Sequence, residues 1–68
     1  MVYKSDDKRK IDVSSIVFLI GYDYYPYFNI RFLLRGADIV EWSYETKEAR
    51  DREMVAIYNV KNSLRSAR

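Results

Sequence analysis

The side chains of this sequence that could bind or react are chiefly tyrosines, and they are concentrated in one short stretch. Residues 21–28 read GYDYYPYF and contain four of the seven tyrosines, together with Phe28 and the only proline, Pro26. A tyrosine ring is large, stiff and apolar with a polar tip, so it suits a contact surface at little entropic cost. The proline restricts Tyr25 to extended geometry and fixes its own φ. The stretch therefore predicts a rigid binding loop.

Catalytic chemistry has few candidates, because the chain contains neither histidine nor cysteine. Their absence excludes disulfides and nearly all zinc, haem and iron–sulfur sites. The carboxylates of Glu41 and Glu45 alternate with Ser43, but that is the ordinary composition of a solvated strand face. With only two glycines, no glycine-rich loop can cradle a phosphate. We predict that the protein is not an enzyme and has no cofactor or metal.

Basic residues form a second group, near the C-terminus. They recur every three or four residues, so on a helix they fall along one ridge. Such a ridge could follow the phosphates of a nucleic acid or meet an acidic protein surface. Alternatively, the long stems flank the apolar face of the helix and the charges complement its dipole. The candidate nucleic-acid-binding residues are Lys47, Arg50, Tyr58, Lys61 and Arg65, with Met54 and Arg68 on the same ridge.

The length of 68 residues corresponds to one domain, and a chain this short leaves much of its surface unburied. Because disulfides and metals cannot reinforce it, we expect a homodimer. The net charge of +2 is too small to indicate nucleic acid by itself. The charged start, MVYKSDDKRK, lacks the apolar core of a signal peptide, and the longest apolar run, IVFLI, is too short to cross a bilayer. We therefore expect a cytoplasmic protein with no membrane partner.

The elements that must position these residues are strands followed by a helix. Residues 1–13 can form a short hairpin that is prone to fray. Residues 16–22 are β-branched and aromatic, which predicts a strand buried on both faces or nearly so. Residues 27–35 and 39–45 alternate with period 2, and Gly36 supplies a turn between them at positive φ. Residues 16–45 therefore predict an antiparallel meander.

Residues 47–64 have helical periodicity and contain no glycine or proline, and Thr46 is the predicted N-cap. Glu53 projects near the middle of the apolar stripe, where it could pair with Arg31 or Arg35, lie beyond the core if the first helical turns overhang it, or serve as a buried carboxylate that changes protonation. The predicted fold is a single α+β domain, a small antiparallel β-meander of three to four strands with one C-terminal amphipathic helix packed on one face. The apolar stripe of the helix consists of Ala49, Ala56, Ile57, Val60 and Leu64.

The tyrosine loop connects the first two strands of the meander, at one end of the sheet. Tyr22, Tyr27 and Phe28 could instead cap the core as strand-end residues. Tyr24 and Tyr25 are harder to bury, because neighbouring strand positions face opposite sides. The loop therefore predicts an exposed aromatic surface.

Trp42 and Tyr44 share a sheet face with Val40. If the helix covers the opposite face, they form an apolar patch that needs a partner. The predicted protein interface comprises Tyr22, Tyr24, Tyr25, Tyr27, Trp42 and Tyr44.

These features predict a small regulatory or inhibitory module that acts by protein–protein contact through its rigid aromatic loop. Its size and lack of catalytic residues also fit a phage or mobile-element inhibitor of a host protein. The alternative is a nucleic-acid-binding protein that sets the basic ridge on phosphates and stacks bases on tyrosines. Salt separates the two, because phosphate binding weakens steeply as salt rises.

Overall fold

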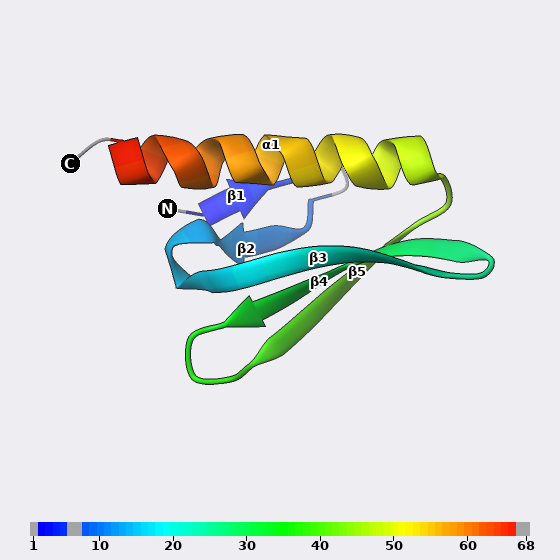
Figure 1. The fold of residues 1–68 in the computed structure, drawn as a ribbon, viewed down its shortest axis with the longest axis horizontal. Helices are drawn as coiled ribbons and strands as arrows, with labels where there is room; N and C mark the ends of the chain where they lie inside the picture. Colours follow the sequence, from blue (N-terminus) through cyan, green and yellow to red (C-terminus); the bar gives the residue numbers. More distant parts are fainter. Residues whose placement is uncertain (1, 6–7, 67–68) are drawn as a thin grey trace.

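The computed structural model describes residues 2–5 and 8–66 and has two layers, a sheet and a helix that lies across it (Figure 1). This arrangement confirms the predicted α+β meander with a C-terminal helix. The elements are β1 (Val2–Lys4), β2 (Lys10–Asp12), the 3-10 turn η1 (Val13–Ser15), β3 (Ile16–Tyr24), β4 (Tyr27–Leu34), β5 (Ile39–Tyr44) and α1 (Lys47–Ser66).

The strands form two antiparallel sheets. The larger has the order β3-β4-β5, and the smaller is the predicted N-terminal hairpin of β1 and β2. The hairpin lies against the helix, where the hydroxyl of Tyr3 donates a hydrogen bond to Glu53 at 2.6 Å. Ile11 of β2 and Val13 of η1 are buried and extend the core beyond the larger sheet.

The turn η1 is fixed at its start by Asp12. Its carboxylate accepts hydrogen bonds from the backbone N–H of Ser14 and from the hydroxyls of Ser14 and Ser15. Hydrogen bonding to the charged form stabilises it. These bonds, that from the Ser14 hydroxyl foremost, hold the pKa of Asp12 at about 2, below its ordinary value of 3.8.

The two connections within the larger sheet are tight. The peptide bond between Tyr25 and Pro26 is cis, and these two residues alone join β3 to β4. Residues 35–38 join β4 to β5, and the backbone N–H of Leu34 donates to the carbonyl of Asp38 at 2.8 Å to close the loop. Gly36 has the positive φ predicted for it, +87°, and Ala37 also has a positive φ.

The helix begins where the sequence predicts and extends past the predicted end at residue 64. The Thr46 hydroxyl accepts a hydrogen bond from the Ala49 N–H at 3.1 Å, which satisfies one of the free donors at the helix start. Ile57, in the predicted apolar stripe, is fully buried, and Val60 and Leu64 pack partly buried against the core. The amphipathic stripe thus holds the helix on the sheet.

The helix covers the sheet face that carries Ile30, Phe32 and Trp42. Phe32 and Trp42 contact each other edge to face with ring centroids 4.9 Å apart, and Trp42 is only 7% exposed. Trp42 is therefore a core residue, and no exposed patch forms around it. The prediction that residues 16–22 are buried on both faces is wrong, because one helix covers one face only and leaves Phe18 and Ile20 about half exposed.

Candidate interaction surface

The face of the larger sheet opposite the helix, called here the open face, is covered by no helix or strand of the described residues, although Asn29 on it is only 6% exposed. Residues directly paired across antiparallel strands lie on the same face, so the register gives its composition in rows. The rows are Phe18, Leu33 and Ile39; then Ile20, Arg31 and Glu41; then Tyr22, Asn29 and Ser43; and last Tyr24 with Tyr27 beside the hairpin turn.

The first row, called the apolar row, contains only apolar side chains. Phe18 and Ile39 are exposed and Leu33 is half-buried. Val17 next to it is also exposed, at a β-bulge where the pairing of β3 with β4 shifts. An antiparallel sheet that faces water usually presents polar residues there. A contiguous apolar row on an open sheet face is therefore a candidate contact surface.

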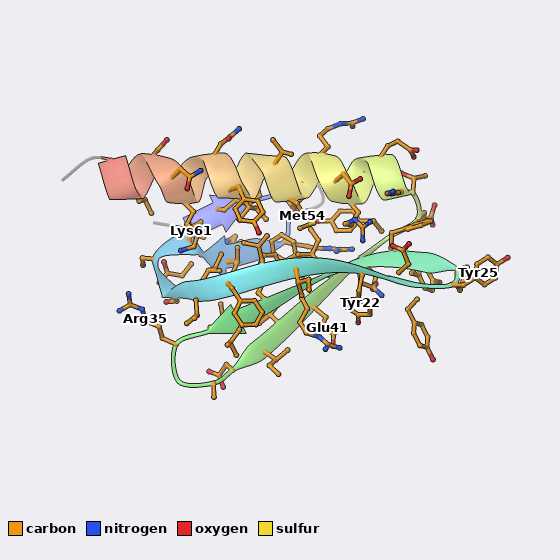
Figure 2. All side chains as sticks on the ribbon, viewed as in Figure 1. Tyr22, Tyr25, Arg35, Glu41, Met54 and Lys61 are labelled. Carbon is orange, nitrogen blue, oxygen red and sulfur yellow. The ribbon has the colours of Figure 1, made fainter. Side chains whose placement is uncertain are left out.

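The second row carries one cation and one anion, and with Tyr22 they form a network, called the charged cluster. Arg31 and Glu41 form an ion pair at 3.4 Å, the guanidinium carbon of Arg31 lies 4.8 Å from the centre of the Tyr22 ring, and the Tyr22 hydroxyl donates to Glu41. That hydrogen bond raises the pKa of the Tyr22 phenol above its ordinary value of 10.0. Figure 2 shows Tyr22 and Glu41 on the side of the sheet away from the helix.

The aromatic hairpin end consists of Tyr24, Tyr25 and Tyr27. Tyr24 is 72% exposed and Tyr25 is 93% exposed, and Tyr25 projects at the end of the molecule where the helix begins (Figure 2). Tyr27 is also exposed, beside Tyr24 across the turn. The predicted alternative that Tyr22 and Tyr27 cap the core is wrong, because both lie on the open face and the core is on the other side. Phe28 does face the helix and is half-buried.

The structure therefore brings together four of the six residues predicted for a protein interface, the tyrosines of the GYDYYPYF stretch. Trp42 is buried. Tyr44 is half-buried on the helix side, where its hydroxyl donates to Glu53 at 3.3 Å and the guanidinium of Arg9 lies 5.0 Å from its ring centre. The expected pairing of Glu53 with Arg31 or Arg35 is wrong, because tyrosine hydroxyls from β1 and β5 reach it instead.

Phe18, Ile20 and Ile39 are surface residues that sequence analysis did not select. The signal was present, because Phe18, Ile20 and Tyr22 alternate with Leu19 and Gly21 at period 2. The continuous apolar run in residues 16–20 concealed it, since both faces of that strand are apolar.

The basic ridge on the helix lies along β3 and is partly buried. Arg50 is 5% exposed, and its guanidinium bonds Asp23 at 3.2 Å, Asp51 at 2.7 Å and the carbonyl of Asn29 at 3.3 Å. The Tyr58 hydroxyl donates to the carbonyl of Leu19 on β3 at 3.2 Å. Arg50 and Tyr58 thus hold the helix on the sheet.

The other ridge residues differ in exposure. Lys47 is exposed, whereas Lys61 is half-buried and directed from the helix toward the sheet (Figure 2). The side chain of Arg65 and all of Arg68 lie outside the part of the chain that the structure describes. Among the described ridge residues, the arrangement agrees better with long stems flanking the helix–sheet contact than with a free cationic surface.

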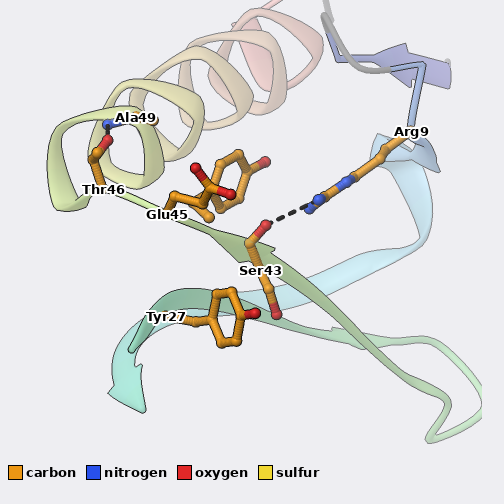
Figure 3. Close-up of a pocket in the computed structure, with 7 residues that line it drawn as sticks. Arg9, Tyr27, Ser43, Glu45, Thr46 and Ala49 are labelled. Carbon is orange, nitrogen blue, oxygen red and sulfur yellow. Dashed lines mark hydrogen bonds between the residues drawn. The ribbon is translucent and has the colours of Figure 1, made fainter. Parts of the chain in front are cut away.

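A hollow of about 670 Å³ lies where the end of β5 meets the start of the helix (Figure 3). Arg9 lines one side of the hollow, and its guanidinium donates a hydrogen bond to the carbonyl of Ser43 at 2.9 Å. On another wall the Thr46 hydroxyl caps the helix. These polar groups stabilise the junction between the N-terminal hairpin, β5 and the helix. Tyr27 also lines the hollow, so it adjoins the aromatic hairpin end.

Within residues 2–5 and 8–66, no three acidic side chains gather as ligands for a metal ion. No helix in the same residues is long and apolar enough to cross a membrane. Comparison of the chain with protein families, curated proteins and solved structures gives no significant match.

Proposed function

We propose that the protein is a small binding module that recognises another protein through the aromatic hairpin end. The observation that carries this proposal is the exposure of three tyrosines at one two-residue turn, Tyr25 within the turn and Tyr24 and Tyr27 on either side of it. Tyrosine is enriched at the energetic centres of protein interfaces, because one ring contributes a large apolar contact and a hydrogen bond together.

The hairpin presents these rings on an ordered backbone. Tyr24 and Tyr27 are paired at the end of a continuous antiparallel ladder, and only Tyr25 and Pro26 lie beyond it. A backbone that is ordered before binding loses little conformational freedom when a partner docks, which favours affinity. A projecting hairpin suits a regulatory or inhibitory role, because it can occupy a recess on a partner and exclude the partner's usual ligand.

Charge supports a protein partner over a nucleic acid. On the open face, which adjoins the hairpin, Arg31 is paired with Glu41, so this surface offers no net positive charge to phosphates. On the helix, Arg50 is enclosed by two aspartates. Base stacking on the exposed tyrosines remains the basis of the nucleic-acid alternative, and the test below separates the two.

The test combines site-specific crosslinking with matched variants. A photoreactive phenylalanine analogue replaces Tyr25 in one protein and Val55 in the control, because Val55 is an apolar residue on the helix that is 58% exposed. We expect a discrete protein adduct from position 25 and none from position 55. In affinity capture, Tyr24→Ala/Tyr25→Ala loses that same protein, whereas Val55→Ala retains it.

Salt and nuclease treatment complete the design. Retention of the adducted protein after nuclease treatment, and between about 50 and about 200 mM salt, supports the proposal. Release by nuclease, a steep loss with salt, or equal capture by the tyrosine variant and the control would overturn it.

A further inference from the structure

The open face has features that the hairpin proposal does not use. Its apolar row and charged cluster lie away from the turn, on the body of the sheet, and involve different side chains from Tyr24 and Tyr25. We propose that this face docks against the open face of a second copy of the chain, so that two sheets pack face to face with their helices outside.

The equal numbers of positive and negative charges on the open face favour a second copy as its partner. The charged cluster contains one cation and one anion, Arg31 and Glu41, which are paired neighbours on adjacent strands. A surface with both charges side by side is complementary to a rotated copy of itself, because each cation can approach the other copy's anion. In a two-fold interface every contact occurs twice, so such self-complementary pairs are its expected content.

The exposed area of the open face is sufficient for a small interface. A large side chain that is about half exposed contributes roughly 100 Å², given about 150–250 Å² for a whole aromatic side chain. The open face away from the hairpin turn therefore offers roughly 500 Å² on each copy, and pairing two copies buries about 1,000 Å², the lower limit for a specific interface. The side chains counted are Phe18, Ile20, Arg31, Ile39 and Glu41, and the half-buried Tyr22 adds a smaller area.

The two edges of the sheet are less suited to pairing than its open face. Strands β3 and β5 are the edge strands, and each has a backbone carbonyl that already accepts a side-chain hydrogen bond, Leu19 from the Tyr58 hydroxyl and Ser43 from the Arg9 guanidinium. Side chains that engage an edge strand discourage the addition of another strand there. The face is thus the better surface for self-association, and it leaves the Tyr25 tips of both copies accessible.

The first experiment measures mass in solution by light scattering across a dilution series. We expect twice the 8.2 kDa of one chain at high concentration and one chain at low concentration, with the midpoint moving modestly to higher concentration as salt screens the ion pairs between copies. Ile39→Lys shifts the midpoint at least tenfold toward higher concentration. Val55→Lys is the matched control, since it adds the same charge at a similarly exposed apolar residue on the helix, and it leaves the midpoint unchanged.

The second experiment tests the charge argument directly. Arg31→Glu places two carboxylates in the cluster, and Glu41→Arg places two guanidinium groups there, so each variant repels its own copies. We expect each to be monomeric alone and the equimolar mixture to form a mixed dimer that weakens with salt. Circular dichroism first establishes that both variants are folded.

A measurement on the unchanged sequence keeps the proposal testable even if a variant does not fold. In a mixture of isotope-labelled and unlabelled protein, filtered nuclear Overhauser spectra report contacts between copies only. Contacts from Phe18 or Ile39 support the proposal. A monomer at every concentration, contacts confined to the helix, or a mixture no more associated than its separate components would overturn it. Loss of dimerisation with the Tyr25 crosslink retained would leave the hairpin proposal standing, so the two fail separately.

Discussion

The two faces of the larger sheet are built by the same three strands, but one is covered and the other is exposed. On one face, Ile30, Phe32 and Trp42 are enclosed by the helix and the N-terminal hairpin. On the other, Phe18, Ile20 and Ile39 remain exposed although they are equally apolar. Apolar character alone therefore does not distinguish the core of this protein from a surface that can receive a partner. The position of one helix makes the difference.

The same contrast holds for charge. Arg50 on the helix side is buried among two carboxylates and a backbone carbonyl, whereas the side chain of Arg31 on the open face is 48% exposed and has one carboxylate partner. The Arg50 guanidinium is itself buried and is held by several partners at once, although the side chains of Asp23 and Asp51 are 61% and 51% exposed. An exposed pair such as Arg31 and Glu41 can exchange partners at little cost. Arg50 therefore contributes to the fold, and Arg31 is available for recognition.

The largest expected effect compares one residue type on the two faces. Ile30→Ala should lower the free energy of unfolding by about 2–5 kcal/mol, because Ile30 is 0% exposed and truncation leaves a cavity. Ile20→Ala, at a residue 52% exposed, should lower it by less than about 1 kcal/mol. Urea unfolding at concentrations where the chain is monomeric measures both. Where Ile30→Ala fails to fold, Ile30→Val against Ile20→Val gives the same comparison on a smaller scale, and equal losses would contradict it.

The second comparison concerns the two arginines. Arg50→Gln should lower the free energy of unfolding by about 1.5–3 kcal/mol, because it removes several charged hydrogen bonds in a buried setting. Arg31→Gln should lower it by about 0–1 kcal/mol, as for other surface pairs. The same unfolding experiment at low and moderate salt is the measurement. A larger loss from Arg31 would mean that the open-face pair contributes to the fold rather than to recognition.

The helix approaches the covered face of the sheet closely at Gly21 on β3. A Cβ added at Gly21 would lie 2.8 Å from the sulfur of Met54 and 3.0 Å from Nη1 of Arg50, so Gly21→Ala should destabilise by about 1–3 kcal/mol. In the background of Met54→Ala the penalty should shrink, since the crowding sulfur is gone. A double-mutant cycle of thermal unfolding measures this coupling, and additive losses would contradict the contact.

The smallest effect is a titration on the open face. The hydrogen bond to Glu41 raises the pKa of Tyr22 above 10.0, so its contribution to stability is complete below pH 10 and is lost as pH rises through the folded-state pKa. Glu41→Gln should therefore lower the pKa of Tyr22 toward 10.0. The free energy of unfolding should then depend less on pH in the range where the Tyr22 phenol ionises. Ring chemical shifts of Tyr22 against pH are the measurement, and Glu45→Gln, which removes a carboxylate outside the charged cluster, is the control. An unchanged titration in Glu41→Gln would contradict the assigned cause.

Much of the fold could be predicted because its signals are local. The alternation in residues 27–35 and 39–45, the turn at Gly36 and the cap at Thr46 depend on backbone geometry and on residues a few positions apart. The helical stripe around Ile57 was equally readable. The tyrosines of the hairpin lie together as predicted, since they are close in the chain and the two-residue turn keeps the ends of β3 and β4 side by side.

The role of Arg50 could not be predicted in the same way. Its spacing places it on the basic ridge, and that ridge exists. Whether the ridge faces solvent depends on how the helix is rotated and where its axis lies above the sheet. In the folded chain the axis runs so that Arg50 reaches Asp23 on β3. The distance between Arg50 and Asp23 cannot be inferred from the spacing of residues along the helix or the strand.

The sequence by itself determined the order of the strands, the start of the helix and the place of the aromatic hairpin, because each follows from short-range periodicity and turn chemistry. Only the tertiary structure decided which face of β5 is core. The register that sets Trp42 against Ile30 assigns Trp42 to the covered face and Ile39 to the open one. A shift of one residue would have reversed them, because successive side chains on a strand point to opposite faces. Long-range hydrogen bonding, which the sequence pattern does not specify, makes that choice.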